Sequence, residues 1–422
     1  MSRTRSDDTT LLNTDCACGC GSSHQIEGLF RRKASRRSIL QSMALLPFGV
    51  GGLMDAAGAQ VVGKPEASKL RLGYVPVTCA VPILAASAFG FFESEGLEVE
   101  LARTPSWALV RDKLINGEYD ASQLILPMPL AISMGVGSTP TPIRVAAIEN
   151  TNGSAVVLHQ KHRGRQDPRQ WKGFKFGVPF EQSIHNLLLR YLLAESGLNP
   201  DTDVEIRVMP PADSVSSLQS GNLDGMLFAE PWGQRAVFEG AGFYYALSRD
   251  IFPGHACCAV SVTERFVAER PNTYGALVRS LVKAINFVAI PDNKPKVAEV
   301  LSGPGYFNQP KVVLEQVLLG RFADGLGQVK SVPDRIAFKA QPSVPGGIWM
   351  LTQMRRWGYI KTDIDYAALV SRVFAPEELR QQMRGMGVPT SDGDDPVNVL
   401  GKPFDSSDPE KYLASFAIAR RS

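Results

Sequence analysis

The chain has 422 residues, of which 44% are hydrophobic and 21% are charged, as in an ordinary globular protein with room for two compact domains. Its 45 Lys and Arg residues nearly balance its 42 Asp and Glu residues, so the formal net charge is only +3. This balance argues against a nucleic-acid partner, which needs a strongly basic surface. No apolar run reaches the roughly 18 residues of a membrane-spanning helix, so we expect no such helix.

Residues 1–59 are predicted to be an export signal that is removed from the mature protein. Paired arginines at 36–37 precede a moderately apolar stretch at 43–53, and the sequence Ala-Gly-Ala at 57–59 offers small residues to signal peptidase. This order is typical of a twin-arginine signal. The alternative is a basic N-terminus that contains Ala-Gly-Ala by chance. We expect the mature protein to begin near Gln60 and to reside in the periplasm of a double-membraned bacterium.

The predicted signal is rich in cysteine near its start, where Cys16, Cys18 and Cys20 are followed by His24. Such a density of thiols can bind zinc or copper. The spacing differs, however, from the paired Cys-x-x-Cys of a structural zinc site, and cleavage of the signal would remove it. We therefore interpret these cysteines as part of the signal, without a role in the mature protein.

Three cysteines remain in the mature chain: Cys79, Cys257 and Cys258. An odd number in an oxidising compartment leaves at least one thiol free. A strained bond between the adjacent Cys257 and Cys258, or a bond from Cys79 to either of them, stays open. The favoured interpretation is that all three are small buried hydrophobic residues. We expect no metal and no cofactor.

The mature chain begins with a strand–helix–strand pattern. Residues 70–75 are predicted to form a strand, 82–87 a helix of small residues, and 96–101 a second strand. Gly90 and Gly96 frame the return because glycine tolerates the left-handed conformation that ends a helix. This spacing predicts a βαβ unit with parallel strands.

The alternation continues through two similar sets of elements. Residues 117–124 and 221–228 share the same turn-then-strand pattern. The further expected strands are 143–148, 154–158, 175–178, 204–208 and 259–262, and the expected helices are 107–114, 183–195, 213–220, 265–288 and 346–359. The two sets predict an α/β fold of two lobes with a double crossover.

We assign residues 60–157 to the first part of lobe 1 and 158–254 to lobe 2. Residues 255–422 form the return segment of lobe 1 and a C-terminal extension. In such architectures ligands lie in the cleft, at helix N-termini and strand ends. Closure of the lobes over the ligand is the expected motion.

Three candidate ligand-binding positions lie where a strand gives way to a helix. Trp107 follows a plausible N-cap residue, His185 opens the helix of the second set, and Trp232 precedes Gly233 after a strand. An indole N–H, an imidazole N–H and the backbone N–H of Gly233 could all serve an anion. The alternatives are a core tryptophan, a capping or packing histidine, and a tryptophan packed beneath a turn.

Three further candidates lie at the crossovers. Asn152 and Ser154 flank a glycine at the first crossover, where an amide and a hydroxyl could bond a small oxyanion. The alternative is a plain turn, since Asn-Gly is a strong turn signal. His255 lies at the return crossover and could add a donor or a cation.

The sequence of these segments resembles the nitrate/bicarbonate-binding (NrtA/CmpA) branch of the periplasmic solute-binding proteins that feed ABC importers. The matching segments span residues 70–374 and include Thr-Cys-Ala-Val-Pro at 78–82, Ser-Trp-Ala at 106–108, Leu-Pro-Met-Pro-Leu at 126–130, His185 onward, Glu-Pro-Trp at 230–232 and Arg-Trp-Gly-Tyr at 356–359. The resemblance implies a two-lobe periplasmic binding protein-like (type II) fold with a hinge cleft and a helical C-terminal extension. It also implies an ABC permease as partner.

In nitrate binders of this type a tryptophan, a histidine and the Glu-Pro-Trp turn hold the anion. These positions match Trp107, His185 and Trp232 with Gly233. Two positions depart from the family pattern: Ser154 stands where glutamine is usual, and His255 stands near the place of a lysine. The bicarbonate binders carry an acidic residue there, which works with calcium.

The resemblance therefore predicts a non-enzymatic binder of a small oxyanion, nitrate or nitrite first, with bicarbonate, cyanate or another small solute as alternatives. A second hypothesis is a nitrate or nitrite sensor of the same fold, which the export signal argues against. A third is an enzyme related to thiamin-pyrimidine synthases, which would need a metal-linked set of cysteine and histidine. Cys79 and the Cys257-Cys258 pair do not suggest such a set from sequence alone.

Overall fold

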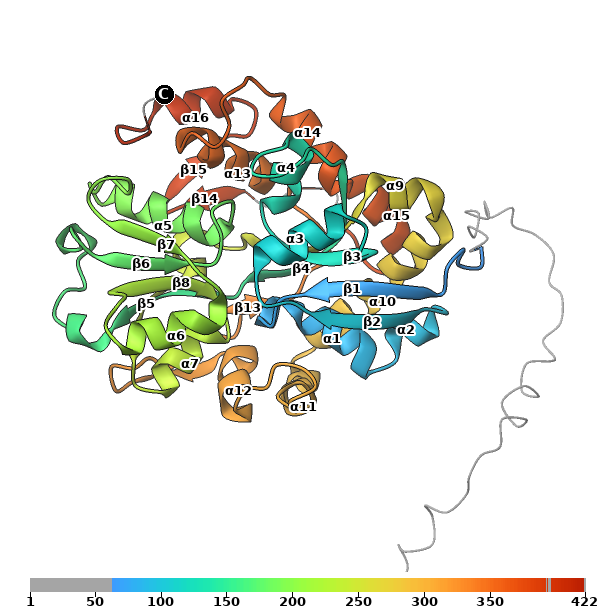
Figure 1. The fold of residues 1–422 in the computed structure, drawn as a ribbon, viewed down its shortest axis with the longest axis horizontal. Coiled ribbons are helices and arrows are strands. Elements are labelled where there is room, and N and C mark those ends of the chain that lie inside the picture. Colours follow the sequence, from blue (N-terminus) through green and yellow to red (C-terminus); the bar gives the residue numbers. More distant parts are fainter. Residues whose placement is uncertain (1–62, 392, 394–395, 421–422) are drawn as a thin grey trace, which may run out of the picture. The chain divides into compact units, whose positions relative to one another are not determined.

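The protein is described by a computed structural model over residues 63–391, 393 and 396–420. The predicted export signal, with its three cysteines and its cleavage site, lies outside these residues. Two mixed sheets, each covered by helices, form the described chain (Figure 1).

The first sheet has six strands in the order β13-β4-β10-β3-β1-β2. β1 runs parallel to β2 and β3, whereas β10 is antiparallel to both β3 and β4. The strands are β1 (Lys69–Tyr74), β2 (Glu98–Arg103), β3 (Ala121–Ile125), β4 (Ile143–Asn152), β10 (Ala256–Thr263) and β13 (Ile336–Ala337). Its connecting helices are η1 (Thr78–Ala80), α1 (Val81–Ala88), α2 (Phe91–Ser94), α3 (Trp107–Ile115) and α4 (Met128–Met134). The predicted opening βαβ unit is present as β1, α1 and β2.

The second sheet repeats this plan with five strands in the order β7-β6-β8-β5-β9. β6 is parallel to β7 and β8, and β5 is inserted antiparallel between β8 and β9. The strands are β5 (Ser154–His159), β6 (Lys175–Val178), β7 (Glu205–Val208), β8 (Gly225–Ala229) and β9 (Gly242–Leu247). The helices are η2 (Gln160–His162), η3 (Pro168–Gln170), α5 (Ile184–Glu195), α6 (Pro211–Gln219), α7 (Trp232–Phe238) and α8 (Ser248–Ile251).

The chain crosses between the sheets twice. The first crossover follows β4, where Asn152 and Gly153 take positive φ angles of 60° and 82°. Ser154 already pairs with Ala229 of β8, so the chain enters the second sheet at Ser154, a few residues before the expected boundary at 157. The reason is local: the left-handed pair turns the chain at once, and glycine permits that geometry without strain. The return crossover passes through Gly254 into β10.

The C-terminal part continues around both lobes. α13 packs against α5 of the second lobe, whereas α14 packs against β4 and α4 of the first. The expected helix at 265–288 is broken at Arg270, because Pro271 starts a new helix where its missing N–H costs nothing. The elements are α9 (Glu264–Glu269), α10 (Pro271–Ala289), η4 (Pro291–Asn293), α11 (Lys294–Leu301), α12 (Lys311–Leu319), β11 (Arg321–Ala323), β12 (Val329–Ser331), α13 (Val344–Arg356), α14 (Tyr366–Phe374), α15 (Pro376–Gly385), β14 (Val397–Val399), β15 (Lys402–Phe404) and α16 (Pro409–Ala414).

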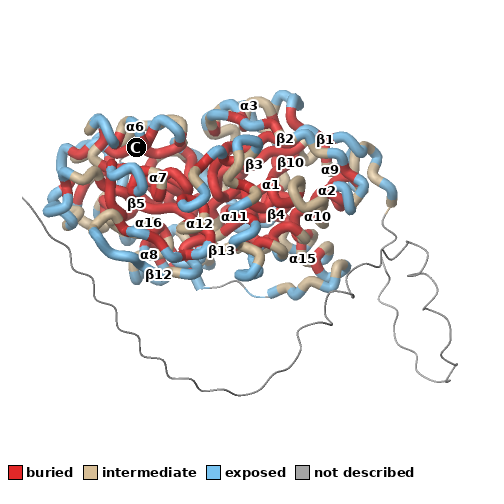
Figure 2. The backbone as a smooth tube through the Cα atoms, turned by 90° about the horizontal axis from the view of Figure 1, so that it is seen from below, coloured by how far each residue is buried: buried red, intermediate tan, exposed pale blue. Residues whose placement is uncertain are grey.

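The central strands of both sheets are buried, whereas the edge strands β2 and β7 are partly exposed (Figure 2). One continuous apolar cluster joins residues of both lobes, including Trp107 of α3, Leu187 of α5 and Trp349 of α13. Within residues 63–420 no single helix has the length and apolar character needed to cross a membrane, although the bent pair of α10 with the following helix meets that test by composition.

Candidate functional site

The two lobes touch along the cleft through backbone and side-chain hydrogen bonds. The backbone N–H and the hydroxyl of Thr78 both donate to the carbonyl of Glu230, at 2.5 and 2.9 Å. Trp232 donates its indole N–H to the carbonyl of Pro76 at 3.2 Å, and Ile184 donates its backbone N–H to Leu126 at 2.6 Å. These contacts join the two lobes directly.

Trp107 begins α3, next to the N-cap residue Ser106, whose hydroxyl accepts a hydrogen bond from the backbone N–H of Leu109 at 3.4 Å. The Trp107 side chain is 1% exposed. Its indole nitrogen has no hydrogen-bond partner in the described part of the chain. Because buried N–H groups are nearly always paired in proteins, this one is a candidate donor to a bound solute.

His185 is the second residue of α5, which Ser183 caps through a 3.1 Å hydrogen bond from the backbone N–H of Asn186. The imidazole is fully buried. Its Nε2 atom lies 2.8 Å from the hydroxyl of Ser154, so two predicted site residues meet at the first crossover. The other ring nitrogen, Nδ1, is buried without a partner among residues 63–420 that the structure describes.

Asn152 serves the crossover itself. Its side-chain oxygen accepts from the backbone N–H of Gly254 at 2.9 Å, and its amide nitrogen donates to the carbonyl of Asp334 at 3.0 Å. Its backbone N–H donates to the carbonyl of His255 at 2.9 Å. Asn152 therefore joins three segments of the hinge. This agrees with the interpretation of Asn152 as part of a turn and not as a ligand contact.

His255 lies in the return crossover, 2% exposed, with both ring nitrogens unpaired within the described residues. Burial lowers the pKa of His255 to about 4. The sequence left open whether this residue supplies a donor or a cation. The structure favours a neutral imidazole at pH 7, because the buried ring has no acidic partner to hold a charge.

Trp232 and Gly233 begin α7 behind the Glu-Pro-Trp turn. The Trp232 indole is occupied by its bond to Pro76, so it closes the cleft rather than presenting a free donor. A Cβ atom added to Gly233 would lie 3.1 Å from a carboxylate oxygen of Glu230. Gly233 thus leaves room for that carboxylate, and the Glu-Pro-Trp motif has a structural use in this chain.

The Glu230 carboxylate is the centre of a buried polar network that the sequence did not reveal. It pairs with Arg335, whose side chain is 1% exposed, and accepts from the hydroxyl of Tyr244 at 2.7 Å and the backbone N–H of Gln234 at 2.8 Å. Arg335 also uses its backbone carbonyl to accept from Gly153 at 2.7 Å. One residue therefore holds both the hinge turn and the Glu-Pro-Trp turn.

The three cysteines of the mature chain come together beside His185. The Sγ atom of Cys257 lies 3.5 Å from that of Cys79, 4.0 Å from that of Cys258 and 3.8 Å from His185 Nε2. All three thiols are free and fully buried. Hydrogen bonds from the two other thiols lower the pKa of Cys257 well below its usual value, whereas burial raises the pKa of Cys79 and of Cys258. Cys79, which the sequence separates widely from Cys257 and Cys258, therefore lies beside them, and all three are buried as expected.

Glu149, in β4, is a second feature that sequence analysis missed. The side chain is fully buried, and neither carboxyl oxygen has a hydrogen-bond partner in the chain as described. Burial raises the pKa of Glu149 well above its usual value, and Gln123 offsets only part of this effect. The signal in the sequence is an acidic residue directly after the apolar run at 145–148 of this strand.

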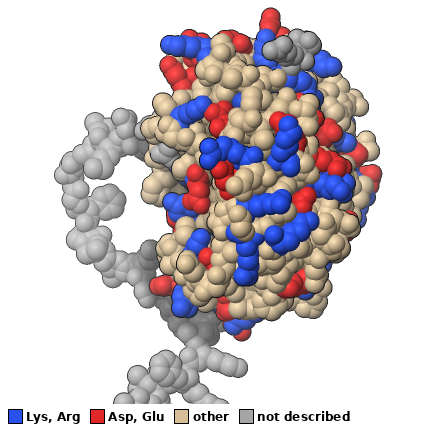
Figure 3. All heavy atoms as spheres, turned by 90° about the vertical axis from the view of Figure 1, so that its left-hand side faces the viewer, with Lys and Arg blue, Asp and Glu red and all other residues tan. Residues whose placement is uncertain are grey.

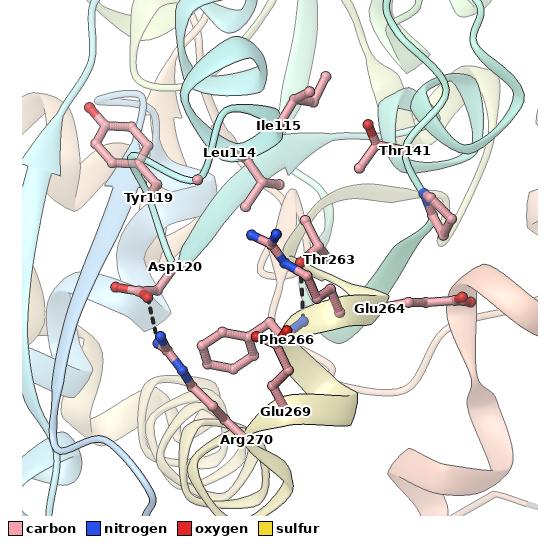
Figure 4. Close-up of a pocket in the computed structure, with 13 residues that line it drawn as sticks. Leu114, Ile115, Tyr119, Asp120, Thr141, Thr263, Glu264, Phe266, Glu269 and Arg270 are labelled. Carbon is pink, nitrogen blue, oxygen red and sulfur yellow. Dashed lines mark hydrogen bonds and ion pairs between the residues drawn. The ribbon is translucent and has the colours of Figure 1, made fainter.

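An open cavity of about 360 Å³ lies elsewhere in the first lobe, between α3 and α9 (Figure 4). The ion pair of Asp120 with Arg270, at 2.9 Å, spans one side of it. Its Thr263 is at the far end of β10 from Cys257, about 20 Å away at the rise of a strand. This cavity is separate from the predicted cleft.

On the outer face of the second lobe basic and acidic side chains are interleaved, without a continuous basic surface (Figure 3).

Two sheets of matching strand order, joined by two crossovers and closed over buried polar groups, define the class of two-lobe periplasmic solute-binding proteins. The profile of the NMT1-like family matches residues 63–302, and the chain belongs to this family.

Similarity to individual proteins extends over most of the chain. It is 26% identical to the nitrate/nitrite binding protein NrtA of Nostoc sp. over 85% of this chain and 87% of that protein. It is 31% identical to the nitrate import ATP-binding protein NrtC of Synechocystis sp. over 88% of this chain, but spans only 58% of that relative. The crystal structure of the periplasmic nitrate-binding protein NrtA from Synechocystis superposes with a TM-score of 0.81 at 25% identity, covering 84% of this chain and 100% of that one.

Proposed function

We propose that this protein is the extracytoplasmic solute-binding component of an ABC importer and that it carries a small oxyanion, nitrate or nitrite, between its lobes. The observation that carries the proposal is the pair of buried, unpaired ring nitrogens on Trp107 and His185, both on first turns of helices. An oxyanion would accept the hydrogen bonds that these groups lack among the described residues. The similarity to nitrate-binding NrtA proteins supports the same ligand class.

The charges around the cleft are compatible with an anion. The helix N-termini beneath Trp107 and His185 carry no acidic residue in their first turns, so their partial positive charge is available. Glu149 does not oppose the anion, because its raised pKa keeps the carboxyl neutral. His255 is neutral as well. Binding would therefore depend on neutral donors and helix ends rather than on a side-chain cation.

Delivery of the solute would follow from the lobe contacts. The hydrogen bonds of Thr78 with Glu230 and of Trp232 with Pro76 cross between the lobes, so they form on closure and break on opening. A solute that bridges α3 and α5 adds to these contacts. The closed form would then be the state that an inner-membrane permease recognises, and the twin-arginine signal would place the protein in the periplasm.

A thermal-shift screen of the full chain tests the ligand class. The ligands are nitrate, nitrite, cyanate, an alkanesulfonate, and bicarbonate with and without calcium. A ligand that binds only the folded state raises its stability by RT ln(1 + [L]/Kd), so nitrate or nitrite should give the largest rise in Tm. If only bicarbonate with calcium raises the Tm, the ligand assignment is wrong although the class of protein stands.

A further inference from the structure

The thiols of Cys79, Cys257 and Cys258 form a compact triangle in the wall of the cleft. All three Sγ atoms lie within 4.8 Å of one another, although one comes from η1 and two from β10. Consecutive side chains of a regular strand point to opposite faces. Here the register of β10 against β4 shifts on both sides of Cys258, and such irregularities bend a strand. The bend allows two neighbouring thiols to face the same third one.

The spacing of the sulfur atoms suits a metal cation. A zinc ion bound by thiolates at about 2.3 Å in tetrahedral geometry separates its sulfur ligands by roughly 3.8 Å. The distances from Cys257 Sγ, 3.5 Å to Cys79 and 4.0 Å to Cys258, bracket that value. Thiolate ligands select soft cations such as zinc(II) and copper(I). His185 Nε2 lies 3.8 Å from Cys257 Sγ, but it is outside the set of atoms that lie within 4.8 Å of one another and it already bonds the hydroxyl of Ser154 at 2.8 Å, so the three thiols alone are the candidate ligands.

Glu149 gives independent support for a cation site here. Its carboxyl group interacts electrostatically with Cys79 and Cys257, is fully buried, and has neither oxygen paired within the described chain. A buried acidic group without a partner is costly. A cation held by the neighbouring sulfur atoms would supply a positive charge beside this carboxyl, which is neutral without it.

We propose that Cys79, Cys257 and Cys258 bind one soft metal cation with a filled d shell, zinc(II) or copper(I), in the wall of the cleft. Copper(I) is satisfied by the three thiolates, whereas zinc(II) also needs a fourth ligand from outside this set. This site goes beyond the proposed function and does not depend on which solute the cleft carries.

The test uses the full chain with Cys16, Cys18 and Cys20 changed to serine, so that only the three buried thiols can bind metal. The protein is reduced, stripped with a chelator and titrated with zinc(II) or copper(I) against a chromophoric competitor, in the absence of nitrate. We expect one equivalent per chain. Cys257→Ser should weaken binding of both metals by at least about 100-fold, since it removes the central ligand.

Ser261→Ala is the matched control, because Ser261 is a buried residue of the same strand and lies outside the thiol triangle. Should Cys257→Ser fail to fold, cobalt(II) replaces zinc(II) as a spectroscopic probe. Cys79→Ala and Cys258→Ala should then each reduce the sulfur-to-cobalt charge-transfer absorbance by about one third. The proposal is overturned if the stripped protein takes up less than one equivalent of zinc(II) and less than one equivalent of copper(I). It is also overturned if the three cysteine variants bind the metal with the same affinity as Ser261→Ala. Neither result depends on nitrate binding.

Discussion

Two parts of the same cleft are equally buried but differ in how their polar atoms are used. Around Glu230, the carboxylate, Arg335, Tyr244 and Gln234 all pair with one another. By contrast, Trp107, His185 and Glu149 each keep at least one buried polar atom without a partner in the described chain. Buried polar groups are normally satisfied. We therefore interpret the first set as a structural network and the second as groups available to a bound ligand.

The largest effect is expected from breaking the paired region. Arg335→Met leaves the Glu230 carboxylate buried and uncompensated, which should lower the free energy of unfolding by about 3–5 kcal/mol. Urea unfolding of the full chain measures this difference. Lys69→Met is the control, since its ion pair with Glu98 has side-chain exposures of 80% and 73% and should change stability by less than about 1 kcal/mol. Similar losses in both variants would contradict a structural role for the Glu230 network.

The next effect concerns pH and the unpaired His255. Its pKa falls from 6.5 to about 4 on folding, so between these values the unfolded chain binds more protons than the folded one. The contribution of His255 is complete above pH 6.5 and is lost as the pH falls towards 4, by about 3 kcal/mol in total. His255→Gln should therefore flatten the dependence of Tm on pH in this window. A variant that loses stability at low pH as steeply as the unmodified protein would show that His255 is not the group responsible.

Much of the fold could be predicted from the sequence because its signals are local. The opening strand, the small-residue helix and Gly90 at its end predicted the parallel pair of β1 with β2. The motifs pointed to Trp107 and His185 because each lies on the first turn of a helix that follows a strand, Trp107 after β2 of the first sheet and His185 after β6 of the second. The meeting of Ser154 with His185 needed only the crossover to bring them together.

The rest depended on contacts between distant parts of the chain. Arg335 reaches Glu230 across 105 positions, and Cys79 meets Cys257 across 178. No spacing rule connects such residues. The roles of Asn152 and Trp232 could not be predicted either, since the amide of one and the indole of the other could both serve a ligand. In the structure the amide donates to the carbonyl of Asp334 and the indole to the carbonyl of Pro76.

Nitrate titration calorimetry on tryptophan variants tests the central claim, that unpaired donors in the cleft hold the solute. Trp107→Phe keeps an aromatic ring but removes the free N–H, and it should weaken nitrate binding about tenfold or more, as expected for one hydrogen bond of about 1.5–3 kcal/mol to a charged acceptor. Trp357→Phe is the matched control: its indole nitrogen is also unpaired in the part of the chain described, but the ring lies beside Arg190 and Arg356 at the end of α13. We predict unchanged affinity for Trp357→Phe and a clear loss for Trp107→Phe. Equal affinity in the two variants would contradict the account.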